Sequence, residues 1–304
     1  MLVRFEESEV GVYLIRIFEV GPRDGLQNLP HIPKTEDKIQ LVKLLREAGL
    51  EHIEIASFVH PKVVPNMADS KEVCEAFDDK TGLSVLVPNK KGLERAKEVG
   101  IDKYNIFFSP LDKFNVANYG LKLNQILDNY KDALEGIPKK QVRVYLSEYF
   151  GAPTDDLEKA VRFALEFGDR VVLCDTKGIA TPFDISVGIQ AAQLYTPYLS
   201  VHLHHGKYLM DNVAVAYREG VREFDASVGG LGGCPFVEES GANLATEDLV
   251  KWCDKRGIDC GVKLKNLKPA MKLAHKIKNP TIRVAIRNKL KDTKNLLKYK
   301  AGLS

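Results

Sequence analysis

The chain has 304 residues, of which 44% are hydrophobic and 28% charged, a composition typical of a soluble globular protein. It has no run of about 20 apolar residues that would form a transmembrane helix and no signal-peptide pattern at its N-terminus, so we expect a cytoplasmic protein without a membrane partner. The formal net charge is +3, and the basic C-terminal end has one aromatic residue, Tyr299, which gives no indication of nucleic-acid binding by base stacking.

Eight short apolar, β-branched segments alternate along the chain with amphipathic segments. Strands are predicted at residues 13–20, 52–56, 83–87, 104–108, 142–146, 170–174, 200–204 and 223–226. Helices are predicted between them, at residues 36–48, 89–99, 123–134, 155–167, 182–195, 209–219 and 247–256. This alternation predicts parallel strands joined by right-handed crossovers. Eight units favour a closed (β/α)8 TIM barrel over residues 1–262, and an open doubly wound sheet is the alternative.

The segment at residues 263–304 lies outside the eightfold pattern and predicts a small helical extension packed on the barrel. From residue 262 onward the chain has thirteen Lys or Arg and one acid, Asp292. Such a segment can attract phosphates, but a solvated helical face is the simpler interpretation. The five cysteines are scattered and odd in number, so we expect free thiols rather than a disulfide framework or a zinc finger.

Polar residues at the carboxyl ends of the predicted strands are the candidates for catalysis, because β/α barrels place their active sites there. Arg23 and Asp24 follow the first strand in the turn EVGPRDGLQN, where one can ligate a metal while the other meets an anion. Glu54 faces the barrel interior from the second strand, and a buried carboxylate needs a partner, for which Arg23 is the natural choice. A surface turn and a structural ion pair are the simpler alternatives.

The later strands supply further candidates. Asp175 follows the sixth strand, although an Asp at such a turn is common for local capping alone. His202 and His204 are two residues apart on the seventh strand, so both imidazoles point to the same side, as suits a divalent metal. Paired core histidines are the alternative.

A glycine-rich segment after the eighth strand contains Cys234 and is followed by Asn243. A thiol on a flexible lid can donate a proton or accept an acyl group, and an inert loop cysteine is the alternative. Asp24, the two imidazoles and an amide oxygen from Asn243 would together favour Mg²⁺ or Mn²⁺ over structural zinc. A guanidinium beside such a metal suits aldol or Claisen chemistry, because it stabilises enolate charge.

Five motifs together resemble the hydroxymethylglutaryl-CoA lyase family within the DRE-TIM metallolyase group. They are EVGPRDGLQN, IEIASFVHPKVVPNMAD, DTKGIATP, VHLHH and GLGGCPFVEESGANLATEDLV, and they occur in the family's order from about residue 17 to about residue 261. The resemblance implies a barrel, a divalent cation and cleavage of 3-hydroxy-3-methylglutaryl-CoA to acetyl-CoA and acetoacetate. We therefore expect an acyl-CoA substrate and, in addition, a homo-oligomer, namely a dimer.

The resemblance also implies a role for each matching residue. Arg23 would polarise the thioester carbonyl and its enolate, and Glu54 and Asp175 would fall in the catalytic pocket. His202 would also lie near the proton removed from the tertiary hydroxyl, and Cys234 would be the lid thiol that helps to protonate the enolate. The implied metal ligands are Asp24, His202, His204 and Asn243.

Three departures from the family pattern affect the loops that shape the pocket. His205 replaces an acid beside a ligand, Lys177 interrupts the DTIG pattern, and the stretch at residues 147–155 lacks the family's cysteine. The predicted ligands survive all three changes. The sequence therefore favours the lyase and leaves open a related aldolase or Claisen condensing enzyme acting on another acyl-CoA or 2-oxoacid. A non-catalytic barrel that binds through its basic tail is the third hypothesis.

Overall fold

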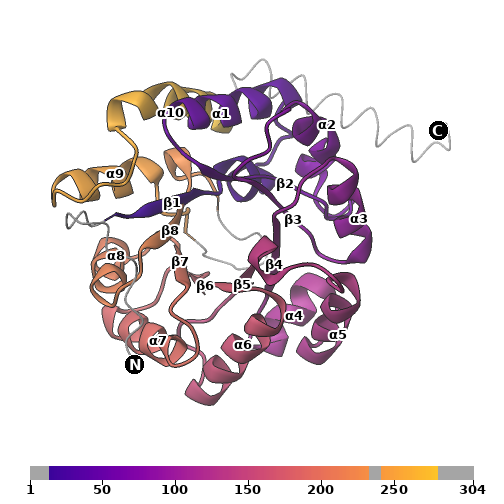
Figure 1. The fold of residues 1–304 in the computed structure, drawn as a ribbon. Coiled ribbons are helices and arrows are strands. Elements are labelled where there is room, and N and C mark those ends of the chain that lie inside the picture. The colour runs from indigo at the N-terminus through magenta and orange to yellow at the C-terminus, as the bar shows by residue number, and fades with distance from the viewer. Residues whose placement is uncertain (1–13, 233–240, 280–304) are drawn as a thin grey trace.

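The computed structural model, described for residues 14–232 and 241–279, is a closed barrel of eight parallel strands in chain order (Figure 1). Register pairs Arg16 with Glu223 and Glu19 with Ala226, so the first strand closes on the eighth. The predicted (β/α)8 barrel is confirmed, and the open doubly wound alternative is wrong because that closure leaves no sheet edge. The strands are β1 (Arg16–Glu19), β2 (His52–Ser57), β3 (Leu83–Leu86), β4 (Tyr104–Phe108), β5 (Val142–Leu146), β6 (Arg170–Asp175), β7 (Leu199–Leu203) and β8 (Glu223–Ala226).

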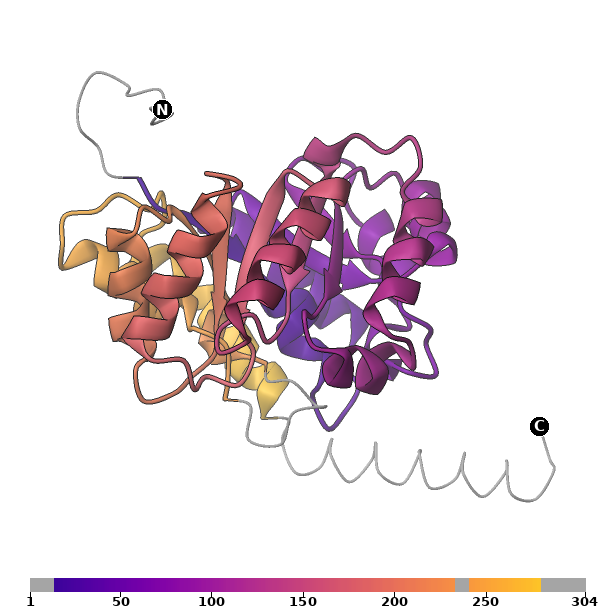
Figure 2. The same cartoon turned by 90° about the horizontal axis from the view of Figure 1, so that it is seen from below.

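Helices surround the barrel on the outside, and the side view in Figure 2 shows them standing along the strands. In the described part of the chain, no helix is both long enough and apolar enough to cross a membrane. The helices are α1 (Thr35–Glu47), α2 (Ser70–Glu75), α3 (Lys90–Glu98), α4 (Asp112–Tyr119), α5 (Leu123–Ala133), α6 (Thr154–Phe167), α7 (Pro182–Gln193), α8 (Leu209–Arg218), α9 (Thr246–Asp254) and α10 (Leu264–Lys278).

Alternation along the strands separates an apolar layer from a polar interior. Ile53 and Val144 belong to one large buried cluster that also contains helix residues such as Leu41 and Val161. The neighbouring residues of the same strands point the other way: Glu54, Arg143 and Tyr145 face the barrel interior and make buried polar contacts. The core therefore lies between barrel and helices, which leaves the inside of the barrel free to carry charged groups.

Local sequence sets the ends of the helices, and α7 is an example. The Thr181 hydroxyl accepts a hydrogen bond from the Asp184 backbone N–H, and the Asp184 carboxylate accepts one from the Thr181 N–H at 2.8 Å. Pro182 occupies the first helical position, where its missing N–H would have no partner within the helix. This capping box starts α7 immediately after the loop that follows β6.

The C-terminal helix α10 packs against α1, as Figure 1 shows. Lys276 forms an ion pair with Asp37 of α1 at 3.7 Å, and the His31 ring bonds to the Ile277 carbonyl at 2.8 Å. Residues 264–278 of the predicted extension therefore form a helix in contact with α1. The boundary at residue 262 stays a prediction, and residues 280–304 lie outside the described residues.

Candidate active site

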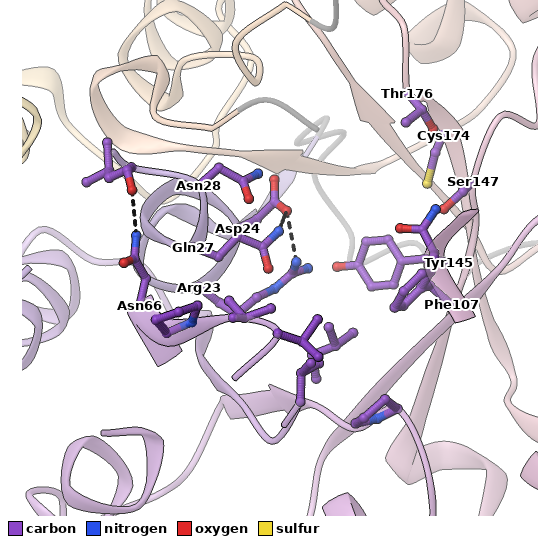
Figure 3. A pocket seen from close by; sticks show the side chains of 18 of the residues that line it. Arg23, Asp24, Gln27, Asn28, Asn66, Phe107, Tyr145, Ser147, Cys174 and Thr176 are labelled. Atoms are coloured by element: carbon purple, nitrogen blue, oxygen red, sulfur yellow. Dashed lines mark hydrogen bonds and ion pairs between the residues drawn. The ribbon is translucent and has the colours of Figure 1, made fainter. Parts of the chain in front are cut away.

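A pocket of about 830 Å³ opens at the carboxyl ends of the strands. Its wall comes from the loops after β1 and β2 and from the ends of β3 to β7. Figure 3 shows Arg23 and Asp24 of the β1 loop on one side and Phe107, Tyr145 and Cys174 on the other. Ile32 and Val63 lie at its apolar outer part and are more than half exposed, whereas Tyr145 and His202 are buried. A concave site with an apolar wall and a few converging polar groups is the usual form of a small-molecule site.

The turn Gly21–Gly25, a π-helical turn directly after β1, places Arg23 in this pocket. The Arg23 guanidinium contacts Glu54 Oε2 through Nε and Nη2, each at 2.5 Å, and Asp24 Oδ1 through Nη1 at 2.8 Å. Glu54 is fully buried and also accepts a hydrogen bond from Asn105 Nδ2 at 2.7 Å. The predicted pairing of Arg23 with Glu54 is confirmed, and it holds the guanidinium in a fixed plane.

Charge at this end of the pocket is set by the same contacts. Burial disfavours charge on Arg23, but Glu54 and Asp24 outweigh it and raise the Arg23 pKa above its ordinary value. Burial also opposes ionisation of Asp24, yet Arg23 and the two nearby imidazoles lower the Asp24 pKa below its ordinary value. At neutral pH the pocket therefore holds a cationic Arg23 beside an ionised Asp24.

The end of β7 brings His202 and His204 together, with their Nε2 atoms 3.0 Å apart. The Nδ1 atom of His202 lies 3.1 Å from Asp225 Oδ2, and that of His204 lies 2.9 Å from the Gly241 carbonyl oxygen. A carboxylate and a carbonyl only accept hydrogen bonds, so each Nδ1 must carry the proton. Two neutral rings would then direct their Nε2 lone pairs toward each other, an arrangement that a metal cation between or beside them would stabilise.

The two imidazoles differ in basicity. Burial lowers the pKa of His202, but the hydrogen bond and charge of Asp225 outweigh it, so the net pKa is raised. Burial, reinforced by the neighbouring His202, lowers the pKa of His204 to about 4. His204 is therefore uncharged throughout the physiological pH range, which leaves the ring a nitrogen lone pair, as metal coordination by imidazole requires.

Asn243 and Asp24 complete the donor set for a metal ion. Asn243 Nδ2 donates to Asp24 Oδ2 at 2.7 Å, while its Oδ1 is buried without a hydrogen-bond partner. An orphaned amide oxygen, a carboxylate and two imidazole lone pairs fit a divalent cation with mixed N and O ligands. Within residues 14–232 and 241–279, however, no three His, Cys, Asp or Glu side chains converge as a preformed metal site. The donors instead form two contacting pairs.

Asp175 occupies a different position from the one expected. Its carboxylate accepts hydrogen bonds from the backbone N–H groups of Ile179 and Ala180, at 3.2 and 3.3 Å, and it is not among the residues lining the pocket. The physical reason is that these backbone N–H groups, at least partly buried, need an acceptor, and this is the local capping alternative. Glu54 likewise lies behind Arg23 rather than in the pocket wall. Cys234 lies outside the described residues.

The loops that depart from the family pattern interlock at the mouth. Lys177 forms an ion pair with Glu148 at 2.5 Å, and the Glu148 N–H donates to the Thr176 hydroxyl at 2.8 Å. Glu148 has a φ of 51°, a left-handed conformation that is rare for residues other than glycine. The backbone N–H of His205, whose side chain is exposed, donates to the Ala242 carbonyl at 2.6 Å. These contacts tie the loop after β5 to the loop after β6, and the loop after β7 to the segment between β8 and α9.

Several residues of the site were missed in the sequence. Tyr145 and Ser147 line the pocket from the end of β5, and Figure 3 shows the Tyr145 hydroxyl directed toward Arg23. Below the pocket, Arg143 and Asp225 are buried inside the barrel. Alternation in VRVYLS places Arg143, Tyr145 and Ser147 on one face, and three polar groups facing a barrel interior were an available signal.

Comparison with known proteins identifies the family. A family model described as HMGL-like matches residues 14–274, most of the chain. The chain belongs to the HMGL-like family. Hydroxymethylglutaryl-CoA lyase YngG of Bacillus subtilis is 37% identical to this HMGL-like protein over 272 residues, covering 85% of this chain and 91% of the relative. The human mitochondrial hydroxymethylglutaryl-CoA lyase is 36% identical over 268 residues, covering 83% and 82%.

Solved structures agree with the sequence relatives. An HMG-CoA lyase from Acinetobacter baumannii, in complex with coenzyme A and 3-methylmalate, superposes with a TM-score of 0.83 at 32% identity, covering 88% of this chain and 92% of that one. The Bacillus subtilis HMG-CoA lyase superposes with a TM-score of 0.82 at 34% identity, covering 90% and 98%. The expected family membership is therefore confirmed, and with it the assignment of the fold to the HMG-CoA lyase type of barrel.

Proposed function

We propose that the protein is a divalent-metal-dependent carbon–carbon lyase that cleaves 3-hydroxy-3-methylglutaryl-CoA to acetyl-CoA and acetoacetate. The observation that carries the proposal is the pair of imidazole Nε2 atoms facing each other at 3.0 Å in a pocket that also holds the Arg23 guanidinium. The hydroxymethylglutaryl-CoA lyases among the relatives support the choice of substrate. We propose Mg²⁺ or Mn²⁺ as the metal, held by Asp24, His202, His204 and Asn243.

The reaction needs three events at named atoms of the substrate. The tertiary hydroxyl at C3 loses its proton, the C2–C3 bond breaks with its electron pair moving into the thioester enolate, and C2 of that enolate is protonated. The C3 fragment leaves as acetoacetate and the protonated enolate as acetyl-CoA. When bound, the divalent cation would chelate the hydroxyl and a carboxylate oxygen of the substrate and lower the hydroxyl pKa.

Arg23 is the residue suited to the negative charge of the enolate. Its guanidinium is cationic, buried and held by Glu54, so it needs little reorganisation when charge develops on the thioester oxygen. His202 lines the pocket, and the family resemblance implies that it lies near the hydroxyl proton. We assign protonation of the enolate to Cys234 on the strength of the family resemblance alone, and Cys234→Ala should then lower turnover while metal binding is kept.

The proposal is tested by the products formed from 3-hydroxy-3-methylglutaryl-CoA in the presence of Mn²⁺. We expect acetyl-CoA and acetoacetate in equal amounts, resolved by chromatography. His204→Ala should abolish turnover and metal binding with the fold intact, because it removes one imidazole donor. His205→Ala is the matched control, since that ring is exposed and lies outside the pocket wall. Turnover by His204→Ala equal to that of the wild type would refute the ligand assignment.

A related aldolase or Claisen enzyme is the second candidate. It is favoured by the wall at Glu148 and Lys177, which departs from the family pattern and borders the pocket residues Ser147 and Thr176. Bound Mn²⁺ without cleavage of 3-hydroxy-3-methylglutaryl-CoA would select this candidate. A panel of other acyl-CoA thioesters and 2-oxoacids would then identify the substrate.

Two further expectations stay predictions. We propose a homodimer, which sedimentation equilibrium would establish from the mass relative to the 33.9 kDa chain. We also propose a cytoplasmic location, which cell fractionation would test.

A further inference from the structure

A line of buried polar side chains runs from the pocket into the inside of the barrel. His202 Nδ1 lies 3.1 Å from Asp225 Oδ2, and the other carboxylate oxygen, Oδ1, accepts a hydrogen bond from Arg143 Nη2 at 2.6 Å. Arg143 Nη1 in turn contacts Glu223, which also accepts a hydrogen bond from the Ser200 hydroxyl at 2.6 Å. The five residues come from β5 and from the adjacent strands β7 and β8.

The two central residues of this line of polar side chains, Asp225 and Arg143, are buried and fully paired. The Asp225 side chain is fully buried and that of Arg143 is 8% exposed, and the Arg143 guanidinium stacks over the Phe18 ring at 4.1 Å. A buried carboxylate is stable only when its oxygens are paired, and here each oxygen has its own partner. Oδ1 accepts from Arg143, which offers donors only, and Oδ2 faces His202 Nδ1, where a carboxylate oxygen can only accept a hydrogen bond. The carboxylate can therefore present only an acceptor to the imidazole.

We propose that Asp225, held by Arg143, is a positioning residue that fixes the Nδ1–H tautomer of His202 and so directs the Nε2 lone pair to the metal. Asp225 does not line the pocket, so it acts through His202 and not on the substrate. The inference rests on the metal site of the proposed function and adds the residue that prepares one of its ligands. Outer partners of this kind orient ligating histidines and strengthen them as donors.

The isosteric change Asp225→Asn tests the role of the carboxylate sharply. The amide oxygen must still face Arg143, since two donors cannot face each other, so the amide NH₂ group faces His202 Nδ1. That NH₂ group needs an acceptor, which forces the proton of His202 onto Nε2 and removes the lone pair from the metal. We expect Mn²⁺ affinity to fall by about 10- to 100-fold, the usual effect of losing such a partner.

Glu223→Gln is the matched control. It alters the other buried acid that binds Arg143, in the same interior network, but Glu223 has no contact with His202. We expect this variant to lose stability while its Mn²⁺ affinity, measured by titration calorimetry, stays within about twofold of the wild type. Equal losses of affinity in both variants would overturn the proposal, because general loosening of the network would then explain the result.

The wild-type protein offers a second test that does not depend on a variant folding. Long-range ¹H–¹⁵N spectra of protein labelled at its histidine nitrogens, recorded without metal at alkaline pH, report the tautomer of each neutral ring. The ring signals that are present in the wild type and absent from the spectrum of His202→Gln are those of His202. The proposal predicts the Nδ1–H form, and the Nε2–H form would overturn it. Failure of wild-type protein to bind Mn²⁺ would instead refute the proposed metal site, while the tautomer still decides the role of Asp225.

Discussion

The planar guanidinium of Arg23 makes contacts that the single ammonium group of a lysine could not make together. Its fork contacts Glu54 through two nitrogens and Asp24 through the third, and 6% of the residue is exposed. A planar guanidinium in such a setting keeps its orientation when substrate charge develops. Catalysis in this pocket should therefore depend on the shape of the cation as well as on its charge.

Arg23→Lys tests this dependence. The ammonium keeps the charge beside Glu54 and Asp24 but cannot reproduce the fork, so we expect kcat to fall about 100-fold with the fold retained. Arg46→Lys is the control, because that guanidinium binds the carbonyl oxygens of Asp79 and Thr81 outside the pocket. Steady-state kinetics would measure both variants, and an unchanged kcat in Arg23→Lys would contradict the role given to the guanidinium.

Gly232 is a second residue whose identity the site requires. A Cβ atom there would meet Asn243 Nδ2 at 2.3 Å and Asp24 Oδ2 at 3.4 Å, and its φ is +115°. Gly232→Ala should therefore displace the Asp24–Asn243 pair and weaken Mn²⁺ binding by at least about tenfold.

Gly257→Ala is the control that separates the effect of backbone strain from the displacement of the Asp24–Asn243 pair. Gly257 has a φ of +65° and nothing within 4 Å of an added Cβ, so its variant carries the conformational penalty alone. Calorimetry should show weakened Mn²⁺ binding in Gly232→Ala and unchanged binding in Gly257→Ala. Normal binding in Gly232→Ala would mean that Asn243 and Asp24 are not ligands in their present positions.

At the scale of elements, the loops after β5 and β6 are joined by two contacts of unequal strength. The Lys177–Glu148 ion pair involves a lysine side chain that is 45% exposed, so it contributes less than about 1 kcal/mol. The hydrogen bond from the Glu148 N–H to the Thr176 hydroxyl is partly buried, and its loss leaves an unpaired donor that costs about 1–3 kcal/mol.

Thr176→Val should therefore be more damaging than Lys177→Met. We expect Thr176→Val to lower the free energy of unfolding. It should also raise KM, because Thr176 and Ser147, which lie in the two loops that this hydrogen bond joins, both line the pocket. Lys177→Met should change KM by only a few-fold. Denaturant titration and initial rates would compare the two, and an equal effect of Lys177→Met would show that the ion pair holds the wall.

The elements themselves were predictable from the sequence, whereas the contacts between them were only partly so. Alternation in VHLHH correctly placed His202 and His204 on one face of β7, because that inference needs only the strand geometry. The sequence left open whether Asp175 faces the pocket or caps its own loop, since the backbone N–H groups that need an acceptor are placed only once the loop is folded. The contact of Asp225 with Arg143 joins β8 to β5, and it depends on the closed barrel.

At the scale of the whole molecule, the barrel keeps buried charges on its inside and its apolar core outside. Glu223 shows the electrostatic consequence: burial would raise its pKa, but Arg143 and other partners lower it to about 2. A lowered pKa contributes stability that is present above the unfolded-state pKa near 4.5 and is lost as the pH falls toward 2.

Glu223→Gln removes this dependence. The wild type should be more stable than the variant by roughly 3 kcal/mol at neutral pH, and the difference should shrink between pH 5 and pH 2. Urea titrations across this range would measure it. A difference that stays constant with pH would mean that Glu223 is not ionised inside the barrel.

The central claim is that this barrel cleaves 3-hydroxy-3-methylglutaryl-CoA with a divalent cation at its mouth, and it is tested most directly by acetoacetate release. The protein would be assayed after removal of metal with a chelator and again after addition of Mn²⁺. The account predicts turnover that disappears with the chelator and returns with Mn²⁺, since Asp24, His204 and Asn243 would then regain their ion. Full turnover in the presence of the chelator would contradict it.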